Sequence, residues 1–295
     1  MSRALATALV VLLLGAPGEY VGAEQFRFAW PVPAAATVVS EAEKDGVAST
    51  ARYAIRLDTA EDGELALDFA DFELLTLNGE DAREPRIAAQ LAPLAAVTAA
   101  LPTMRLTVDG EYRGTRSLNL MLQRILALLP QDMDAAQRDQ LARGLRSPAM
   151  QTLMQQKSGE VWNLWVGAWN GLGLEPGEEL SGTTPITIMG REVAQRIVIE
   201  HLGADAAYPG SARLRMTTVL EGPDVLALLG RIEHETAGQS GDYRAASSRN
   251  VTEVTTRAAD LRPHRVQSET EVVVRDASGR AHRQRERKVY RFEWR

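Results

Sequence analysis

Cysteine is absent from this 295-residue chain, and its absence excludes disulfide bonds, thiol nucleophiles, cysteine metal sites and lipid modification of an N-terminal cysteine. Histidine is scarce, with four residues, and aromatic side chains make up only 5% of the sequence. No apolar run after residue 23 approaches the ~20 residues that a membrane-spanning helix needs. We therefore assign no metal ligand, no cofactor and no catalytic residue, and we expect a chain held together by packing that does not span the membrane once its leader is removed.

Lysine is almost missing, because only three of the 33 basic residues are lysines, at positions 44, 157 and 288. Arginine in this excess, together with abundant alanine, is typical of a GC-rich coding bias. The formal net charge is −6. Such acidity argues against nucleic acid as a partner, since proteins that bind it present a basic surface to the phosphates.

The first 23 residues have the pattern of a secretory signal peptide. Arg3 supplies the positive start, residues 4–15 form an uncharged apolar run, and Val21-Gly22-Ala23 offers a small-residue cleavage site. We therefore expect residues 1–23 to be removed and residues 24–295 to be exported. The coding bias favours a Gram-negative periplasm, and an extracellular location is the alternative.

Alternating apolar and polar residues, the period of half-buried β-strands, dominate both ends of the exported chain. In the first third, Asp45-Gly46 and Asn78-Gly79 interrupt such segments and are strong hairpin signals. The last third holds three long polar segments of the same period, Ser248–Arg257, His264–Arg275 and Ala281–Trp294. These patterns predict antiparallel strands at both ends of the chain.

The middle of the sequence changes to the period of helices. Ser147-Pro148 resembles a helix N-cap followed by a proline in the first helical position, where proline is tolerated. Apolar residues at helical spacing predict a helix over Ser117–Leu129, and we expect two more helices, a mostly polar one over Asp134–Leu145 and one from Pro148 to about Asn170.

Together these elements predict an α+β fold in a single domain, residues 24–295. We expect a large, strongly curved antiparallel sheet, like half of a barrel, with the central helices packed on its concave face. This architecture is similar to that of the half-barrel carriers that move lipoproteins or lipids through the bacterial periplasm. The likeness implies a carrier function and rests on fold alone.

Three tryptophans at spacings of three and four would lie on one side of a helix. One interpretation is that they pack against the sheet, because aromatic stripes dominate protein cores. The alternative is a ligand groove between helices and sheet. Its candidate residues are Met121, Ile125, Met154, Trp162, Trp165 and Trp169.

Charge is distributed unevenly along the chain. Residues 41–84 hold thirteen carboxylates and four basic residues, whereas residues 280–295 hold seven basic residues and two carboxylates. In the last strand, one face carries Arg283, Arg285, Arg287 and Arg291. These arginines are either a solvated outer face with cross-strand ion pairs or a contact for lipid phosphates or another anionic envelope partner.

Three functions stay open at this point. The first is a non-enzymatic binding or carrier protein for an amphiphile or a cell-envelope partner. The second is an exported hydrolase, which would show two facing carboxylates in a cleft, or His264 beside an acid and a serine. The third is a structural or assembly component of the envelope, which would show an apolar patch or an unpaired strand edge.

Overall fold

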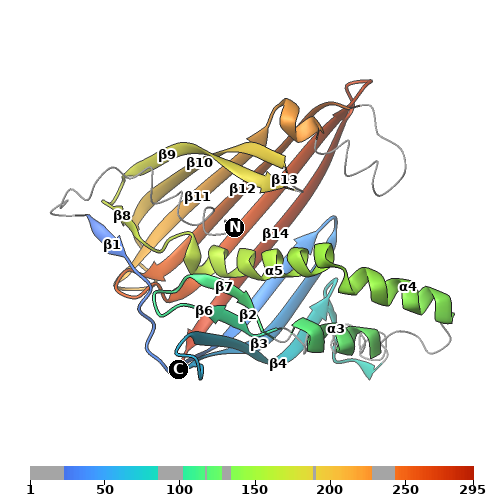
Figure 1. Cartoon of the computed structure of the whole chain (residues 1–295). Helices are drawn as coiled ribbons and strands as arrows, with labels where there is room; N and C mark the ends of the chain where they lie inside the picture. The colour runs from blue at the N-terminus through green and yellow to red at the C-terminus, as the bar shows by residue number, and fades with distance from the viewer. Residues whose placement is uncertain (1–22, 86–101, 117, 128–133, 189–190, 228–242) are drawn as a thin grey trace.

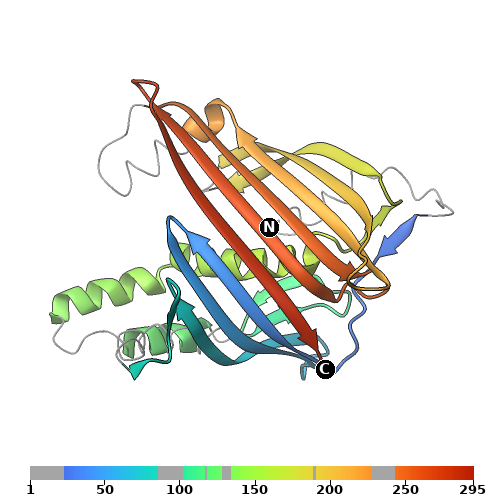
Figure 2. The ribbon, with the colours of Figure 1, turned by 180° about the vertical axis from the view of Figure 1, so that it is seen from behind.

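The structure, a computed structural model, describes residues 23–85, 102–116, 118–127, 134–188, 191–227 and 243–295. The expected signal peptide lies outside the described residues except for Ala23. Figure 1 shows one large, twisted sheet with a helical layer on one side, and Figure 2 shows the opposite side of the sheet from behind.

A single antiparallel sheet of 12 strands makes up most of the molecule, and it is open rather than closed into a barrel. From one edge to the other, its strands are β7 (Tyr112–Thr115), β6 (Met104–Leu106), β4 (Leu65–Leu77), β3 (Val47–Thr59), β2 (Ala34–Lys44), β14 (Ala281–Trp294), β13 (Pro263–Asp276), β12 (Tyr243–Arg257), β11 (Ser211–Glu221), β10 (Arg191–Ala204) and β9 (Glu179–Ile188), with β5 (Glu80–Asp81) paired to β4. A separate two-stranded sheet joins β1 (Glu24–Phe26) to β8 (Leu172–Leu174).

The two ends of the chain meet in the middle of this sheet. Strand β2 pairs with β14 in a register that places Ala36 opposite Trp294 and Lys44 opposite Glu286. The strands expected near the two termini therefore belong to one continuous surface. Their hairpins follow the sequence signals, because Asp45-Gly46 and Asn78-Gly79 both adopt the positive φ angles that a tight two-residue turn requires.

The core lies on the side of the sheet that faces the helical layer. On β14, Tyr290 and Phe292 point inward, and the register continues this inner row through Val266 on β13 and Val254 on β12 to Leu214 on β11. These strands use the strict alternation of side chains along a β-strand to bury one face. The odd-numbered positions of β14 consequently lie on the outer face, away from the helices.

The predicted helices form, but they do not cover the sheet as expected. They are α3 (Leu118–Ala127), α4 (Ala135–Arg146) and α5 (Pro148–Trp162), followed by a π-helical turn, η1 (Asn163–Gly167). Only the C-terminal part of α5 and η1 contribute to the main core, whereas α3 and α4 extend away from the sheet (Figure 1).

The predicted α+β class with central helices is therefore wrong. Strands account for 59% of the structure and helices for 16%. Part of the reason lies in α4, whose sequence AAQRDQLARGLR is polar on most of its surface and offers little apolar area to a sheet. The fold is a mostly β structure built on one open sheet.

Candidate functional site

The tryptophans of the predicted groove lie in the core. Trp162, Trp165 and Trp169 are each 0% exposed. The ring of Trp165 contacts Phe292 edge to face, with centroids 5.1 Å apart, and Trp169 donates its indole N–H to the carbonyl oxygen of Leu164. In this structure the three rings fill the interior. Their role as groove residues stays a prediction.

The other groove candidates are not gathered with the tryptophans. Met121 on α3 packs with Leu118 in a second, small apolar cluster, and Met154 on α5 packs against that cluster. Ile125 also belongs to α3. The structure therefore divides the predicted groove residues between two places instead of bringing them to one surface.

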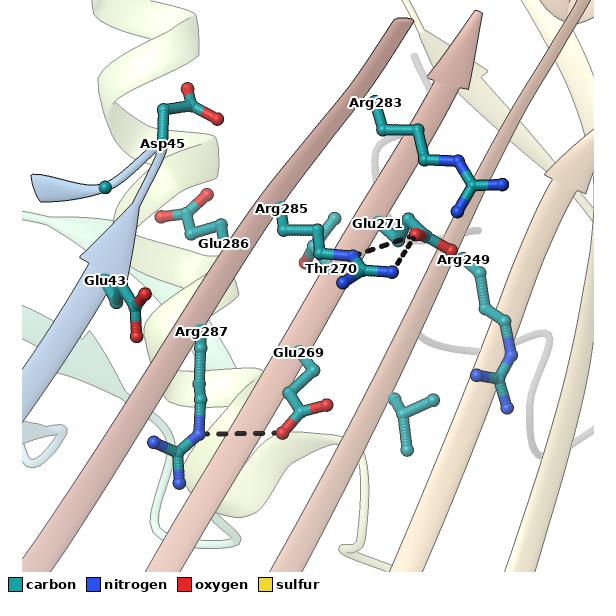
Figure 3. Close-up of a pocket in the computed structure, with 12 residues that line it drawn as sticks. Glu43, Asp45, Arg249, Glu269, Thr270, Glu271, Arg283, Arg285, Glu286 and Arg287 are labelled. Atoms are coloured by element: carbon teal, nitrogen blue, oxygen red, sulfur yellow. Dashed lines mark hydrogen bonds and ion pairs between the residues drawn. The ribbon is translucent and has the colours of Figure 1, made fainter. Parts of the chain in front are cut away.

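The arginines of the last strand do share one face, as their spacing indicates. They lie on the outer face of β14, and Figure 3 shows Arg283, Arg285 and Arg287 in front of the sheet, with the helix behind it. Arg285 and Arg287 reach across to the neighbouring strand β13, where Arg285 Nη2 is 2.9 Å from Glu271 Oε1 and Arg287 Nε is 3.6 Å from Glu269 Oε1. Such exposed pairs contribute about 0–1 kcal/mol each, so they order the surface more than they stabilise the fold.

Arg291 pairs with the other neighbouring strand of β14, which is β2. It forms a two-pronged ion pair with Glu41 on β2, and this hydrogen bonding raises the pKa of its guanidinium above the ordinary value. Beside it on the same outer face, Val289 is only 1% exposed, although its cross-strand neighbours are Glu41 and Gln267. The aliphatic stems of long polar side chains can cover apolar surface in this way.

A cavity of about 780 Å³ opens on this outer face, between the β2–β3 hairpin and the distal half of β12, β13 and β14. Figure 3 shows it with the strands running diagonally. The charged residues that line it are four arginines and five acidic residues, of which Glu286 occupies an inward position of β14: Arg249, Arg283, Arg285, Arg287, Glu43, Asp45, Glu269, Glu271 and Glu286. Val251 supplies apolar surface among them.

Two of these arginines have no partner among the residues that the structure describes. Arg283 on β14 and Arg249 on β12 have neither an ion pair nor a side-chain hydrogen bond with any residue that the structure describes. In the register, Glu271 on β13 stands directly between Arg249 and Arg285. Of the three arginines near this carboxylate only Arg285 pairs with it, and the guanidinium of Arg249 points away from it, which leaves a local excess of positive charge at this end of the cavity (Figure 3).

Sequence reasoning missed Arg249 entirely. Its strand alternates, so its outer-facing position could have been read from the period of two. The register of β12, β13 and β14 cannot be predicted from a local pattern. That register places Arg249 beside Glu271 and near Arg283.

The alternative of a hydrolase directs attention to His264. Its ring stacks on Tyr208, with centroids 4.5 Å apart, and burial lowers its pKa below the ordinary value. The nearby carboxylates already have partners, since Asp260 accepts a hydrogen bond from Arg262 and Asp205 accepts one from Thr255. The hydrolase stays a prediction that no contact of His264 described here supports.

Comparison with protein-family models finds none that matches the chain, and comparison with curated proteins finds no match either. Within the described part of the chain, no cluster of three or more histidine and acidic side chains has the arrangement to hold a metal ion. None of the helices described is long and apolar enough to cross a membrane.

Proposed function

We propose that this protein is a non-enzymatic binding protein of the cell envelope, and that it holds the charged headgroup of an amphiphile in the cavity on the outer face of β12–β14. The observation that carries the proposal is that Arg249 and Arg283, at the edge of a cavity of about 780 Å³, have no partner within the described part of the chain. Guanidinium groups are well suited to phosphate, because their planar N–H donors match its oxygens in pairs.

The surroundings of the cavity suit an amphiphile rather than a bare ion. Val251 lines the cavity, and Val47, at the tip of the bordering β2–β3 hairpin, is 53% exposed. Val273 lies opposite Arg283 across β13 and β14 on the same outer face and is partly exposed. A ligand with an anionic head and apolar chains would find both kinds of surface within one region.

The volume is also appropriate, because small-molecule sites commonly measure ~300–1,000 Å³. Exported location, which the leader predicts, would bring the protein together with envelope lipids. The proposal assigns no reaction to the site. It extends the sequence expectation of an envelope-binding protein and moves the contact from the predicted tryptophan groove to the arginine face.

Native mass spectrometry of the protein purified from its own cells tests this function, together with flotation of the purified protein with phosphatidylethanolamine–phosphatidylglycerol vesicles. We expect bound lipid in the first experiment and flotation in the second. The double variant Arg249→Gln/Arg283→Gln should lose most of both signals.

Arg56→Gln is the matched control, because Arg56 is an exposed arginine of the outer face that pairs with Asp71 at 3.7 Å and lies outside the cavity. It should float like the unmodified protein. Ligand-free protein that ignores the vesicles would overturn the proposed function.

A further inference from the structure

The cavity has a negative end as well as a positive one. Glu43 belongs to β2 and Asp45 to the turn that follows, and both line the cavity on the side of β14 that faces away from Arg249. Asp45 accepts a hydrogen bond from the neutral amide of Gln284, which anchors the carboxylate without cancelling its charge. Glu43 has no ion pair with the residues that the structure describes.

The remaining charges of the cavity are compensated within the protein. Glu271 pairs with Arg285, Glu269 with Arg287, and Glu286 with Lys288 outside the lining. What is left over is Arg249 on β12, Arg283 on β14, and Glu43 and Asp45 on the β2 side, where Glu43 stands opposite Arg287 in the register without an ion pair to it. A ligand of one sign would be attracted by one end and repelled by the other.

From this division we infer that the cavity recognises a zwitterionic headgroup, a phosphate joined to a primary ammonium, with the phosphate at Arg249 and Arg283 and the ammonium at Glu43 and Asp45. This inference rests on the proposed function, which it makes specific.

The spacing of the strands permits this arrangement. Neighbouring strands lie about 4.8 Å apart, so β12 and β14 are separated by roughly 10 Å. The side chain of Arg283 points from β14 across β13 toward β12, whereas the guanidinium of Arg249 points away from it (Figure 3), so Arg249 must change rotamer for both groups to reach an anion held above β13. An ammonium on the opposite side of β14 would then lie next to the carboxylates of the hairpin.

The lining also distinguishes a primary ammonium from a quaternary one. Quaternary ammonium groups cannot donate hydrogen bonds and are recognised by aromatic rings, and no aromatic side chain lines this cavity among the described residues. Carboxylates, in contrast, accept hydrogen bonds from an N–H donor and strengthen them with charge. Ethanolamine-type heads therefore fit, and choline-type heads do not.

Calorimetric titration with three soluble short-chain lipids of identical acyl chains tests the inference: phosphatidylethanolamine, phosphatidylglycerol and phosphatidylcholine. We expect phosphatidylethanolamine to bind at least tenfold more tightly than the other two. Equal affinity for phosphatidylethanolamine and phosphatidylglycerol would overturn the assignment of the negative end.

Variants separate the two ends. Glu43→Gln/Asp45→Asn should lower the affinity for phosphatidylethanolamine to the level of phosphatidylglycerol and leave phosphatidylglycerol binding no weaker. Asparagine suits position 45, because it tolerates the positive φ of 50° found there. Arg249→Gln/Arg283→Gln should weaken all three lipids, and Arg56→Gln should weaken none. Equal weakening of all three lipids by the hairpin variant would contradict a dedicated ammonium site.

A last titration, with O-phosphoethanolamine, keeps the inference distinct from the proposed function. This probe has the headgroup without acyl chains. If it binds as tightly as the lipid and responds to the same variants, the result supports the zwitterion site and contradicts the proposal that the ligand is an amphiphile. If no lipid and no headgroup binds, both proposals fall.

Discussion

Trp162 donates its indole N–H to the carbonyl oxygen of Gly110 over 2.8 Å, and this bond joins the end of α5 to the turn between β6 and β7. The tryptophan ring also contacts Phe28 edge to face, with centroids 5.7 Å apart. Gly110 itself has a φ of +81°, and a Cβ atom there would overlap the side chain of Phe28 at Cγ. Helix end, hairpin and N-terminal segment therefore depend on one another at this point.

We predict that Trp162→Phe destabilises the protein by about 1–3 kcal/mol more than Trp165→Phe. Both rings are fully buried and close in sequence, but the indole N–H of Trp165 has no hydrogen-bond partner among the described residues. Trp162→Phe thus leaves a buried carbonyl oxygen unsatisfied, a loss that Trp165→Phe does not cause. Urea unfolding of the two variants measures the difference, and equal midpoints would refute the role of the bond.

Gly110→Ala should be the more damaging of two matched glycine substitutions. Gly79 has nearly the same backbone, with a φ of +83°, yet nothing lies within 4 Å of the place where its Cβ would be. Gly79→Ala therefore carries the backbone penalty alone, about 1–2 kcal/mol. Gly110→Ala adds overpacking against Phe28, which typically costs a further ~1–3 kcal/mol.

Thermal unfolding of both glycine variants compares the two effects. A larger loss of melting temperature for Gly110→Ala is the expected outcome. If Gly79→Ala proved equally harmful, the contact with Phe28 would have no energetic weight.

Much of the sheet could be predicted from the sequence because its signals are local. The period of two marked the strands, and dipeptides such as Asp45-Gly46 and Asn78-Gly79 marked the turns, whose positive φ angles few other residue pairs adopt cheaply. The helices over α3, α4 and α5 were likewise predicted close to their observed bounds, although η1 ends the last one with a π-helical turn.

The class of the fold could not be predicted in the same way. An apolar stripe shows that a helix will bury one side, but not which surface receives it. Met121 and Met154 illustrate this, since they pack in a small cluster apart from the main core instead of against the inner face of the sheet. The expectation that the helices would cover the sheet was wrong because the sequence does not show which surface each helix packs against.

The candidate site shows the same division. Arg283, Arg285 and Arg287 were placed on one face by their spacing alone. The ion-pair partners of these arginines could not be predicted from the sequence, because the register of β13 with β14 is what places Glu269 and Glu271 opposite them. Long-range pairing decides which arginines are neutralised and which stay available.

Our last prediction concerns Tyr290, whose phenol lies in the core beside Trp165, with the two rings 5.5 Å apart. Burial, with a smaller contribution from the charge of Glu286, raises its pKa to about 12, from an ordinary value near 10. Tyr53 belongs to the same core, and burial likewise raises its pKa. Both phenols are therefore protonated in the folded protein at a pH where they ionise in the unfolded chain.

The sign of the effect follows from proton binding. Between about pH 10 and 12 the unfolded state holds fewer protons than the folded state, so the free energy of unfolding falls as the pH rises. The contribution of Tyr290 is fully present below pH 10 and disappears as the pH passes its folded pKa, a loss of up to about 2–3 kcal/mol.

Tyr290→Phe removes this titration while keeping the ring, so its stability should fall less steeply than that of the unmodified protein over the same pH window. Chemical denaturation at a series of alkaline pH values gives both slopes, and tyrosinate absorbance of the folded protein follows the ionisation directly. Arginines and exposed tyrosines titrate in both proteins and cancel in the comparison. Parallel stability curves would mean that the Tyr290 phenol reaches water in the folded state, which contradicts its placement in the core.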